Sequence, residues 1–322
     1  MGNVLVTAIG SFSAHTVIDT LKELGHKVCG CDIYPREWIA SSADVDVFYQ
    51  SPYASDESYV NFILEKCEEN SVKWVMPLTD VEVDVLNKNR EVFDDRGIVL
   101  CISDQEVIEL CRNKFTLSKF IEENGKVVDT IPTYRASELG AKDIKLPVIC
   151  KPFNGRSSIG LQIIGTPDDL ESVLSDSDAE FYIIQPFVKG SVVTVDVVRD
   201  RADNCVAVAR KELLRTLNGA GTSVHVFHDE ELEQKSKDLA RLLKITGCVN
   251  FEFILDKDGN YHFLECNPRF SGGVVFSCMA GYSCVANHLR AFKGEQIEPF
   301  ALSRNYYIAR RYESHIMSEE DL

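Results

Sequence analysis

Strand-like and helix-like segments alternate over the first hundred residues, and this rhythm constrains the fold more than any other feature of the sequence. Short apolar runs at residues 4–9, 28–31, 74–77 and 98–102 predict strands, and segments with helical periodicity lie between them. Strands that alternate with helices form a parallel sheet covered by those helices. The sequence therefore predicts an N-terminal α/β domain with a parallel sheet over residues 1–105.

The rhythm changes after Pro132. Short β-rich runs bounded by Gly, Asn and Asp dominate from there to residue 227, and a helix at 229–245 and a hairpin at 248–266 follow. This pattern is typical of an α+β region. We expect two lobes in it, a central lobe over residues 106–183 that carries a glycine-rich lid loop and a C-terminal lobe over residues 184–322.

Charge and cysteine usage exclude several classes of protein. The formal net charge is -16, and because binding to a nucleic-acid backbone needs a basic surface, we expect small molecules as partners instead. The eleven cysteines include no Cys-x-x-Cys pair, and their odd number argues against a secreted disulfide framework. No stretch approaches the roughly 20 apolar residues of a membrane span. These features predict a cytoplasmic protein without a membrane partner.

The first strand-to-helix turn holds only part of a dinucleotide-binding fingerprint. Gly10 is in place and Asp32 could be the ribose acid, but the other two glycines are missing. The sequence therefore does not favour NAD binding at this turn.

A second glycine-rich segment, at residues 148–161, is a stronger candidate for phosphate binding. Lys151 ends an apolar strand, and the loop after it carries Gly155, Ser157, Ser158 and Gly160. The glycines have the spacing of a Walker loop, but the Lys-Ser/Thr pair that should follow is absent. Such a loop can present backbone N–H groups to phosphates while Lys151 adds a positive charge. The alternative is an ordinary glycine hairpin with a solvated lysine.

Residues 250–267 predict a hairpin whose turn is Asp258-Gly259, a favoured two-residue type I′ turn. The resulting register places three opposed pairs on one face, namely Glu252 with Glu265, Asn250 with Asn267, and Ile254 with Phe263. The other face is predicted as core, with Phe251, Phe253, Leu255, Leu264 and Cys266.

Two directly opposed glutamates, with Cβ atoms about 5 Å apart, destabilise a hairpin unless something neutralises them. A shared proton is one answer and a hard divalent cation is the other. Carboxylates beside an amide oxygen suit Mg²⁺, which completes its shell with water and substrate phosphates. The alternative is an exposed strand face with solvated acids. Arg269 follows the second strand and brings a guanidinium close to the same place.

Four segments carry a more specific signal. They are Lys151 before a Gly/Ser loop, Ile184-Gln185-Pro186-Phe187-Val188 with Gly190, Asn250-Phe251-Glu252-Phe253, and Leu264-Glu265-Cys266-Asn267-Pro268-Arg269-Phe270-Ser271-Gly272-Gly273. In this order they resemble the ATP-grasp superfamily, in particular single-module proteins similar to the large subunit of carbamoyl-phosphate synthase. The resemblance covers almost the whole chain. It implies a pre-ATP-grasp domain followed by a two-lobed ATP-grasp fold.

The resemblance also implies how a nucleotide is held. The residues it assigns to the phosphates are Lys114, Lys151, Gly155, Ser157 and Ser158. Those it assigns to a hinge whose backbone contacts the adenine edge are Gln185, Pro186, Phe187 and Val188.

For the chemistry, the resemblance matches Glu252, Glu265 and Asn267 to the magnesium ligands. It matches Arg269 to the arginine that stabilises the transferring phosphoryl group, with Lys151 as a further catalytic cation. Arg210 lies where the family places basic residues near the γ-phosphate and the acceptor.

The sequence departs from the family pattern at two places. Val192 stands where a glutamate usually contacts the ribose hydroxyls, which puts nucleotide affinity in question. Residues 216–219, Thr-Leu-Asn-Gly, replace a common Arg-Gly-Glu pattern, which puts the acceptor in question.

The resemblance implies an ATP-dependent carboxylate–amine ligase that acts through an acyl-phosphate and releases ADP and phosphate. It implies ATP and two Mg²⁺ ions, with Mn²⁺ as a substitute, and it allows a homodimer. One alternative keeps the fold and phosphorylates bicarbonate to carboxyphosphate, on the way to carbamoyl phosphate. The other alternative is a non-catalytic ATP-binding partner subunit.

Overall fold

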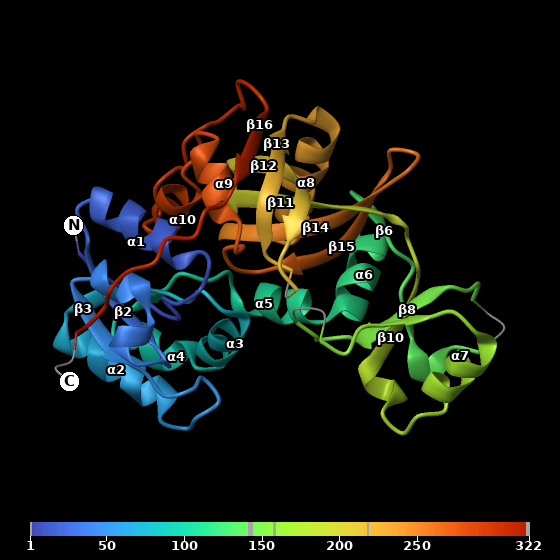
Figure 1. Ribbon diagram of the computed structural model, residues 1–322, viewed down its shortest axis with the longest axis horizontal. Coiled ribbons are helices and arrows are strands. Elements are labelled where there is room, and N and C mark those ends of the chain that lie inside the picture. The colour runs from blue at the N-terminus through green and yellow to red at the C-terminus, as the bar shows by residue number, and fades with distance from the viewer. Residues whose placement is uncertain (1, 141–143, 157–158, 218, 320–322) are drawn as a thin grey trace.

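The computed structural model describes residues 2–140, 144–156, 159–217 and 219–319. Three sheets organise the chain, one five-stranded, one four-stranded and one seven-stranded. The N-terminal domain lies at the left of Figure 1, the seven-stranded sheet at the centre, and the small central lobe at the lower right. Among the described residues, no helix is long and apolar enough to cross a membrane.

The N-terminal sheet is parallel throughout, as the sequence predicts, with the order β3-β2-β1-β4-β5. Its strands are β1 (Asn3–Val6), β2 (Lys27–Asp32), β3 (Val47–Gln50), β4 (Val72–Met76) and β5 (Val99–Leu100). Its helices are α1 (Ala14–Glu23), α2 (Tyr59–Glu69), α3 (Asp80–Lys88) and α4 (Arg90–Asp94), with 3₁₀ turns at η1 (Arg36–Trp38) and η2 (Ala40–Ala43). Alternate strand residues serve the two faces, since Val4 packs toward α1 and Leu5 toward α2.

Two local features of this domain differ from the expectation. The helical segment predicted between the strands at 74–77 and 98–102 is divided at Asn89. The Asn89 side chain donates to the Val85 carbonyl at 2.8 Å and so satisfies an acceptor at the end of α3. Strand β3 was not predicted. It is an edge strand without a fully buried residue, so it lacks a clear apolar signal.

The central lobe is an antiparallel sheet with the order β7-β10-β8-β9 and a small core of its own. Its elements are β7 (Tyr134–Arg135), η3 (Ala136–Glu138), β8 (Val148–Pro152), β9 (Gln162–Ile164), α7 (Pro167–Leu174), η4 (Ala179–Phe181) and β10 (Tyr182–Pro186). Strand β10 pairs with β8 along its whole length. The boundary predicted at 183/184 therefore falls inside a strand of this lobe.

The C-terminal lobe is built on the seven-stranded sheet, in the order β16-β13-β12-β11-β14-β15-β6. Its strands are β6 (Asp129–Thr130), β11 (Gly190–Arg199), β12 (Cys205–Arg215), β13 (Gly221–Phe227), β14 (Gly247–Asp256), β15 (Tyr261–Asn267) and β16 (Tyr306–Ala309). Its helices are α5 (Gln105–Arg112), α6 (Lys114–Glu123), α8 (Glu230–Leu242), α9 (Val274–Met279) and α10 (Cys284–Phe292). Residues from α5, α6 and α8 cover one face.

The other face of this sheet joins the N-terminal domain in one continuous core. Val198, Val206 and Cys248 pack there with α9, α10 and the α1 side of the N-terminal sheet. His288 of α10 ties the two together, because its Nδ1 accepts from the Cys248 N–H at 2.8 Å and its Nε2 lies 3.1 Å from the Cys101 carbonyl. Burial lowers the pKa of His288 to about 3, so this imidazole is neutral at physiological pH. The polar side chains at the other end of this sheet face are not covered by this core, and they line a cleft.

Candidate active site

The hairpin β14–β15 opposes Glu252 to Glu265 and Asn250 to Asn267, as predicted. The predicted turn is wrong. The Asp256 N–H donates to the Asn260 carbonyl at 3.0 Å, which leaves a three-residue loop in which Gly259 has φ +88°. A three-residue loop that ends in a left-handed glycine is the next commonest hairpin connection, and Asp-Gly satisfies it as well.

A compensating irregularity keeps the acids in register. Near the loop Phe253 pairs with Phe263, not Ile254 as predicted, and the register shifts between Glu252 and Phe253. The extra residue on β15 is Leu264, because a bulge places two residues opposite one. Consequently Phe263 is buried in the core that was predicted to hold Leu264, and Leu264 instead lines the cleft beside the acids.

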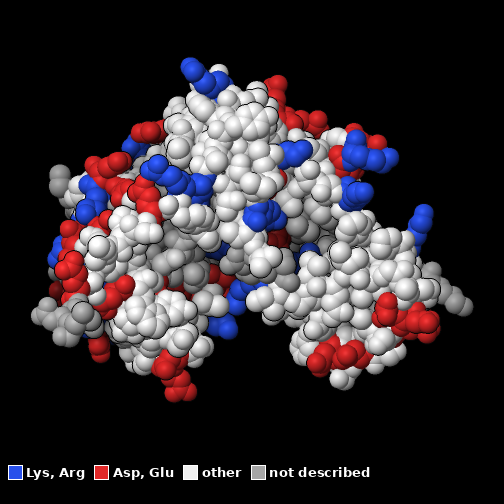
Figure 2. Space-filling view, viewed as in Figure 1, with Lys and Arg blue, Asp and Glu red and all other residues white. Residues whose placement is uncertain are grey.

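A cleft of about 580 Å³ lies above this hairpin and is lined from all three lobes. The N-terminal domain contributes its Gly10–Ser13 turn and the start of α3, the central lobe contributes Lys151 and the glycine loop, and the C-terminal lobe contributes the floor. Acidic side chains gather on the outer surface at the left and lower right, and several basic ones are visible in the central hollow (Figure 2). This distribution suits an anionic ligand in a protein whose net charge is negative.

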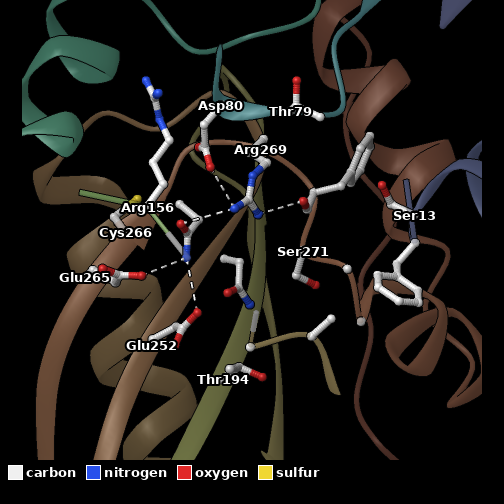
Figure 3. A pocket seen from close by; sticks show the side chains of 18 of the residues that line it. Ser13, Thr79, Asp80, Arg156, Thr194, Glu252, Glu265, Cys266, Arg269 and Ser271 are labelled. Carbon is white, nitrogen blue, oxygen red and sulfur yellow. Dashed lines mark hydrogen bonds and ion pairs between the residues drawn. The ribbon is translucent and has the colours of Figure 1, made fainter. Parts of the chain in front are cut away.

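The two glutamates form the floor of the cleft and are bridged by an amide. Asn267 Nδ2 lies 3.3 Å from Glu252 Oε1 and 3.5 Å from Glu265 Oε1, and Figure 3 shows these contacts. Burial and the charge of Glu265 raise the pKa of Glu252 to about 7. Burial also opposes ionisation of Glu265, but Lys114 and Lys151 outweigh it and lower the pKa of that carboxyl.

These residues fit a divalent cation. Within the described ranges, no three or more His, Cys, Asp or Glu side chains gather as metal ligands. An ion here would be held by the Glu252 and Glu265 carboxylates and by the Asn267 amide oxygen, which would turn toward it from Arg269, with water and phosphate completing its shell, as Mg²⁺ prefers. A cation would also remove the repulsion that raises the pKa of Glu252.

Two lysines stand over the acid pair. Lys114 begins α6, where Asn113 caps the helix by accepting from the Phe115 and Thr116 N–H groups. Its Nζ lies 3.3 Å from Glu265 Oε2 and donates to the Gly155 carbonyl at 2.7 Å. Lys151, on β8, is 7% exposed, and burial together with nearby Lys114 lowers its pKa to about 8 despite the neighbouring glutamates. Both predicted phosphate lysines thus converge on the cleft.

The loop after β8 lines the cleft with Gly155, Arg156, Ile159 and Leu161. Ser157 and Ser158, predicted to contact phosphate, lie outside the described residues. Arg156 forms an ion pair with Asp84 of α3, so the loop reaches the N-terminal domain across the mouth of the cleft. This contact was not predicted, because a single arginine in a glycine loop carries no signal of its partner.

Arg269 lines the cleft beside the acid pair and is held by the N-terminal domain. Its guanidinium lies 2.9 Å from Asp80 Oδ2 and 3.4 Å from Asn267 Oδ1. Asp80 also binds Arg112 at 3.0 Å. Although burial opposes its ionisation, Arg269 and Arg112 lower the pKa of Asp80. Sequence analysis missed Asp80 and Arg112, and the only local sign was the capping box of Thr79 and Glu82 that begins α3.

Arg210 lies in the cleft floor, but its guanidinium is already engaged. It is 1% exposed, and it donates to Asp196 at 2.5 Å, Ser271 at 2.9 Å and Glu212 at 3.2 Å. Asp196 in turn accepts from Asn250 and Ser277. This geometry makes Arg210 a residue that positions the floor, while the catalytic role near the γ-phosphate and acceptor stays a prediction.

The predicted adenine hinge is less clearly part of the same cleft. Gln185 and Pro186 end β10, one strand from Lys151, while Phe187 and Val188 follow. Gln185 is buried and donates to Thr133 at 2.8 Å. None of the described residues that line the cleft comes from this segment. Val192, at the ribose position, pairs with Ile254, so that part of the sheet face is apolar.

Comparisons with known proteins agree with this architecture. Residues 4–101 match the family described as "PylC-like, N-terminal domain", and residues 178–312 match "ATP-grasp in the biosynthetic pathway with Ter operon". Curated relatives match almost the whole chain. Residues 178–312 therefore carry an ATP-grasp domain, and a PylC-like N-terminal domain precedes it.

The relatives are distant. The arginine-specific large chain of carbamoyl phosphate synthase from Bacillus subtilis (strain 168) is 22% identical, over 97% of this chain and 31% of that protein, so this chain spans less than a third of the relative's length. The biotin carboxylase–β,γ-ATP complex from Campylobacter jejuni has a TM-score of 0.78 and 19% identity, over 93% of this chain and 72% of that one. The biotin carboxylase domain dimer of Hydrogenobacter thermophilus 2-oxoglutarate carboxylase, in complex with MgADP, ADP and bicarbonate, has a TM-score of 0.76 and 19% identity, over 93% and 71%.

Proposed function

We propose that this protein is an ATP-dependent ligase that joins a carboxylate to an amine through an acyl-phosphate and releases ADP and phosphate. The observation that carries the proposal is the opposed pair Glu252 and Glu265, bridged by Asn267, beneath Lys114, Lys151 and Arg269. An acidic pair ringed by cations suits a metal-bound polyphosphate, in which negative charge must be both held and neutralised.

The chemistry follows from these positions. A substrate carboxylate oxygen attacks the γ-phosphorus, the bond from that phosphorus to the β–γ bridging oxygen breaks, and ADP leaves. The amine then attacks the acyl carbon, phosphate leaves with the former carboxylate oxygen, and the nitrogen releases its protons to solvent. Lys114 and Lys151 hold the nucleotide phosphates, and Arg269 neutralises charge on the transferring group. Glu252, Glu265 and Asn267 would hold Mg²⁺, which would supply charge neutralisation to the phosphates.

The remaining parts of the proposal concern partners and location. The nucleotide is ATP with two Mg²⁺ ions, for which Mn²⁺ can substitute, and the hinge at Gln185–Val188 receives the adenine. The substrates are small molecules. A homodimer is proposed because one structural relative is described as a domain dimer. A cytoplasmic location is proposed from the cysteine usage of the sequence.

A second candidate keeps the same site and uses bicarbonate as the carboxylate, which gives carboxyphosphate as the intermediate. It is favoured by the names of the relatives, a carbamoyl phosphate synthase and two carboxylases, one of them described with bound bicarbonate. The two candidates share every residue role in the floor of the cleft. They differ only in the carboxylate substrate proposed to lie beside Arg269, which is an organic acid in the first candidate and bicarbonate in the second.

Phosphate release from ATP and Mg²⁺ separates the candidates. The assay uses a panel of amino acids, hydroxy acids and uronic acids, each with and without a primary amine, and bicarbonate alone. Release that needs both an organic acid and an amine supports the ligase. Release stimulated by bicarbonate alone supports the second candidate. Tight nucleotide binding without turnover under any of these conditions would contradict both and indicate a non-catalytic subunit.

A further inference from the structure

The cleft floor contains a carboxylate oxygen for which none of the described residues provides a hydrogen bond. The Glu212 side chain lines the cleft and is only 3% exposed. Its Oε1 accepts from Arg210 Nε at 3.2 Å and from Thr194 Oγ1 at 3.0 Å. Its Oε2 has no hydrogen-bond partner among the described residues. A buried acceptor without a donor is costly and calls for a physical explanation.

Sheet register places this oxygen beside the proposed reaction site. Thr194 of β11 is the partner of Glu252 on one side and of Arg210 on the other. Glu212 follows Arg210 by two residues on β12, so both point to the same face as Thr194 and Glu252. Glu212 therefore lies on the cleft floor two strands away from the proposed metal ligands, at the end remote from Lys114.

Glu212 Oε2 has no direct ionic partner among the described residues. Arg210 is shared between two buried carboxylates, because it binds Asp196 as well as Glu212. Arg310 interacts electrostatically with Glu212, but its N–H groups donate to the carbonyls of Phe12 and Gly272. The Glu212 carboxylate thus keeps one negatively charged oxygen without a direct donor in the cleft wall. Such a charge favours a cation and disfavours a phosphate.

Small residues lie beside the Oε2 side of Glu212. A Cβ at Gly221 would overlap the Glu212 carboxylate, so glycine is needed there for the side chain to adopt this position. A Cβ added at Gly272 would stand 3.4 Å and 3.5 Å from the Cβ atoms of Phe12 and Ala220, so these two side chains lie close to the glycine. The subsite therefore pairs one acceptor with an apolar wall made by both the N-terminal and C-terminal lobes.

We propose that Glu212 is the recognition residue for the second substrate and binds a primary amine in its ammonium form. This proposal rests on the proposed ligase function and assigns the chemical class of its acceptor. The ammonium N–H donates to Oε2, and one proton passes from the nitrogen to this carboxylate before the neutral amine attacks the acyl carbon. A small apolar carbon skeleton lies against Phe12 and Ala220. The Glu212 carboxylate thus selects a cation, while the lysines of the same cleft select the phosphates.

Binding of simple probes tests the subsite without turnover. The protein is saturated with Mg²⁺ and a non-hydrolysable ATP analogue, and ligand-observed NMR follows ethylammonium, with ethanol as the uncharged counterpart. We expect wild type to bind ethylammonium in preference to ethanol. Glu212→Gln should weaken ethylammonium binding about 10- to 100-fold, the range expected for a charged hydrogen bond. Gly221→Ala, which keeps the charge but displaces the carboxylate, should cause the same loss.

The controls decide between this role and others. Glu231→Gln removes an equal charge from the exposed surface of α8 and should leave binding unchanged. Mn²⁺ affinity, measured by electron paramagnetic resonance, should be the same in Glu212→Gln as in wild type. Equal ethylammonium binding by wild type and Glu212→Gln, no preference for the cation in wild type, or a loss of Mn²⁺ in Glu212→Gln would each overturn the proposal.

A trapping experiment separates this proposal from the ligase function itself. Hydroxylamine, uncharged at slightly alkaline pH, intercepts acyl-phosphates as hydroxamates and needs no ammonium site. With the acid panel above, wild type and Glu212→Gln should form hydroxamate equally, while amide formation from a primary amine falls in the variant. Absence of hydroxamate in wild type counts against the ligase function. Equal loss of hydroxamate and amide in Glu212→Gln counts against the subsite alone.

Discussion

The hairpins β14–β15 and β8–β9 both line the cleft, but they are supported in different ways. The first belongs to a seven-stranded sheet whose core continues into the N-terminal domain. The second belongs to a four-stranded sheet with a small separate core (Figure 1), and its side chains Ile159 and Ile163 are 74% and 61% exposed. The contrast teaches that the acid pair is rigidly preorganised, whereas the phosphate loop is held by a few polar contacts and can adjust to the nucleotide.

The largest expected effect comes from a substitution in the acid pair of the rigid hairpin β14–β15. Glu265→Gln removes one charge of the acid pair but keeps its shape, so we expect phosphate release to fall about 10²- to 10³-fold, as when one electrostatic stabiliser is lost. The melting temperature should fall slightly, because the loss of the ion pair with Lys114 outweighs the relief of repulsion on Glu252. Glu231→Gln on the exposed surface is the matched control. Wild-type turnover in Glu265→Gln would exclude this pair as the metal site.

In the β8–β9 hairpin, Lys151→Met should weaken ATP binding about 10- to 100-fold, because a charged contact to the phosphates is lost. The wild-type protein should also show a pH dependence. Because the pKa of Lys151 is lowered to about 8, its charge is present below that pH and is lost above it, so ATP affinity should fall as the pH rises through about 8. Calorimetric titration of both proteins over this range checks the slope. An identical slope in Lys151→Met would assign the titration to another group.

The packing between the C-terminal sheet and the N-terminal domain, which supports the β14–β15 hairpin, should become less stable at low pH. The pKa of His288 is about 3 when folded and 6.5 at its ordinary value. The unfolded chain therefore binds more protons below pH 6.5, and stability falls as the pH drops. We expect His288 to account for a loss of about 2 kcal/mol by pH 5. Urea unfolding at several pH values measures this, and His288→Asn should flatten the dependence. An unchanged dependence in that variant would contradict the role of His288.

The smallest effect should come from the contact that tethers the loop. Arg156→Gln breaks the ion pair with Asp84, and since such partly exposed pairs contribute about 0–1 kcal/mol, global stability should change little. Hydrogen exchange of the backbone around residues 153–161 should become faster, and KM for ATP should rise about threefold at most, equivalent to less than 1 kcal/mol. Unchanged exchange would mean that the loop does not depend on this contact.

The sequence predicted features that depend on local pattern. The parallel sheet follows from alternation, and the opposition of Glu252 to Glu265 survives because two irregularities in the hairpin cancel. The turn itself could not be predicted, since Asp258-Gly259 suits both a type I′ turn and the left-handed end of a three-residue loop. The acids were therefore placed correctly from a turn that was wrong.

Features that depend on tertiary packing were beyond the sequence. Asp80 meets Arg269 across 189 residues of chain, and no local pattern announces such a pair. Arg210 could be placed near the cleft, but its saturation by Asp196 and Ser271 depends on neighbouring strands and a following loop. The unpaired oxygen of Glu212 was invisible for the same reason. Polar networks of this kind can be predicted only when the register of the strands is known.

The transfer of oxygen from the substrate carboxylate to phosphate tests the central claim most directly. The acid that stimulates phosphate release is labelled with ¹⁸O in its carboxylate, and the released phosphate is analysed by mass spectrometry. A phosphoryl group transferred to that carboxylate leaves with one of its oxygens, so we predict one labelled oxygen in each phosphate. Phosphate without label, while the label stays in the product, would show that no acyl-phosphate forms and would contradict the proposed chemistry.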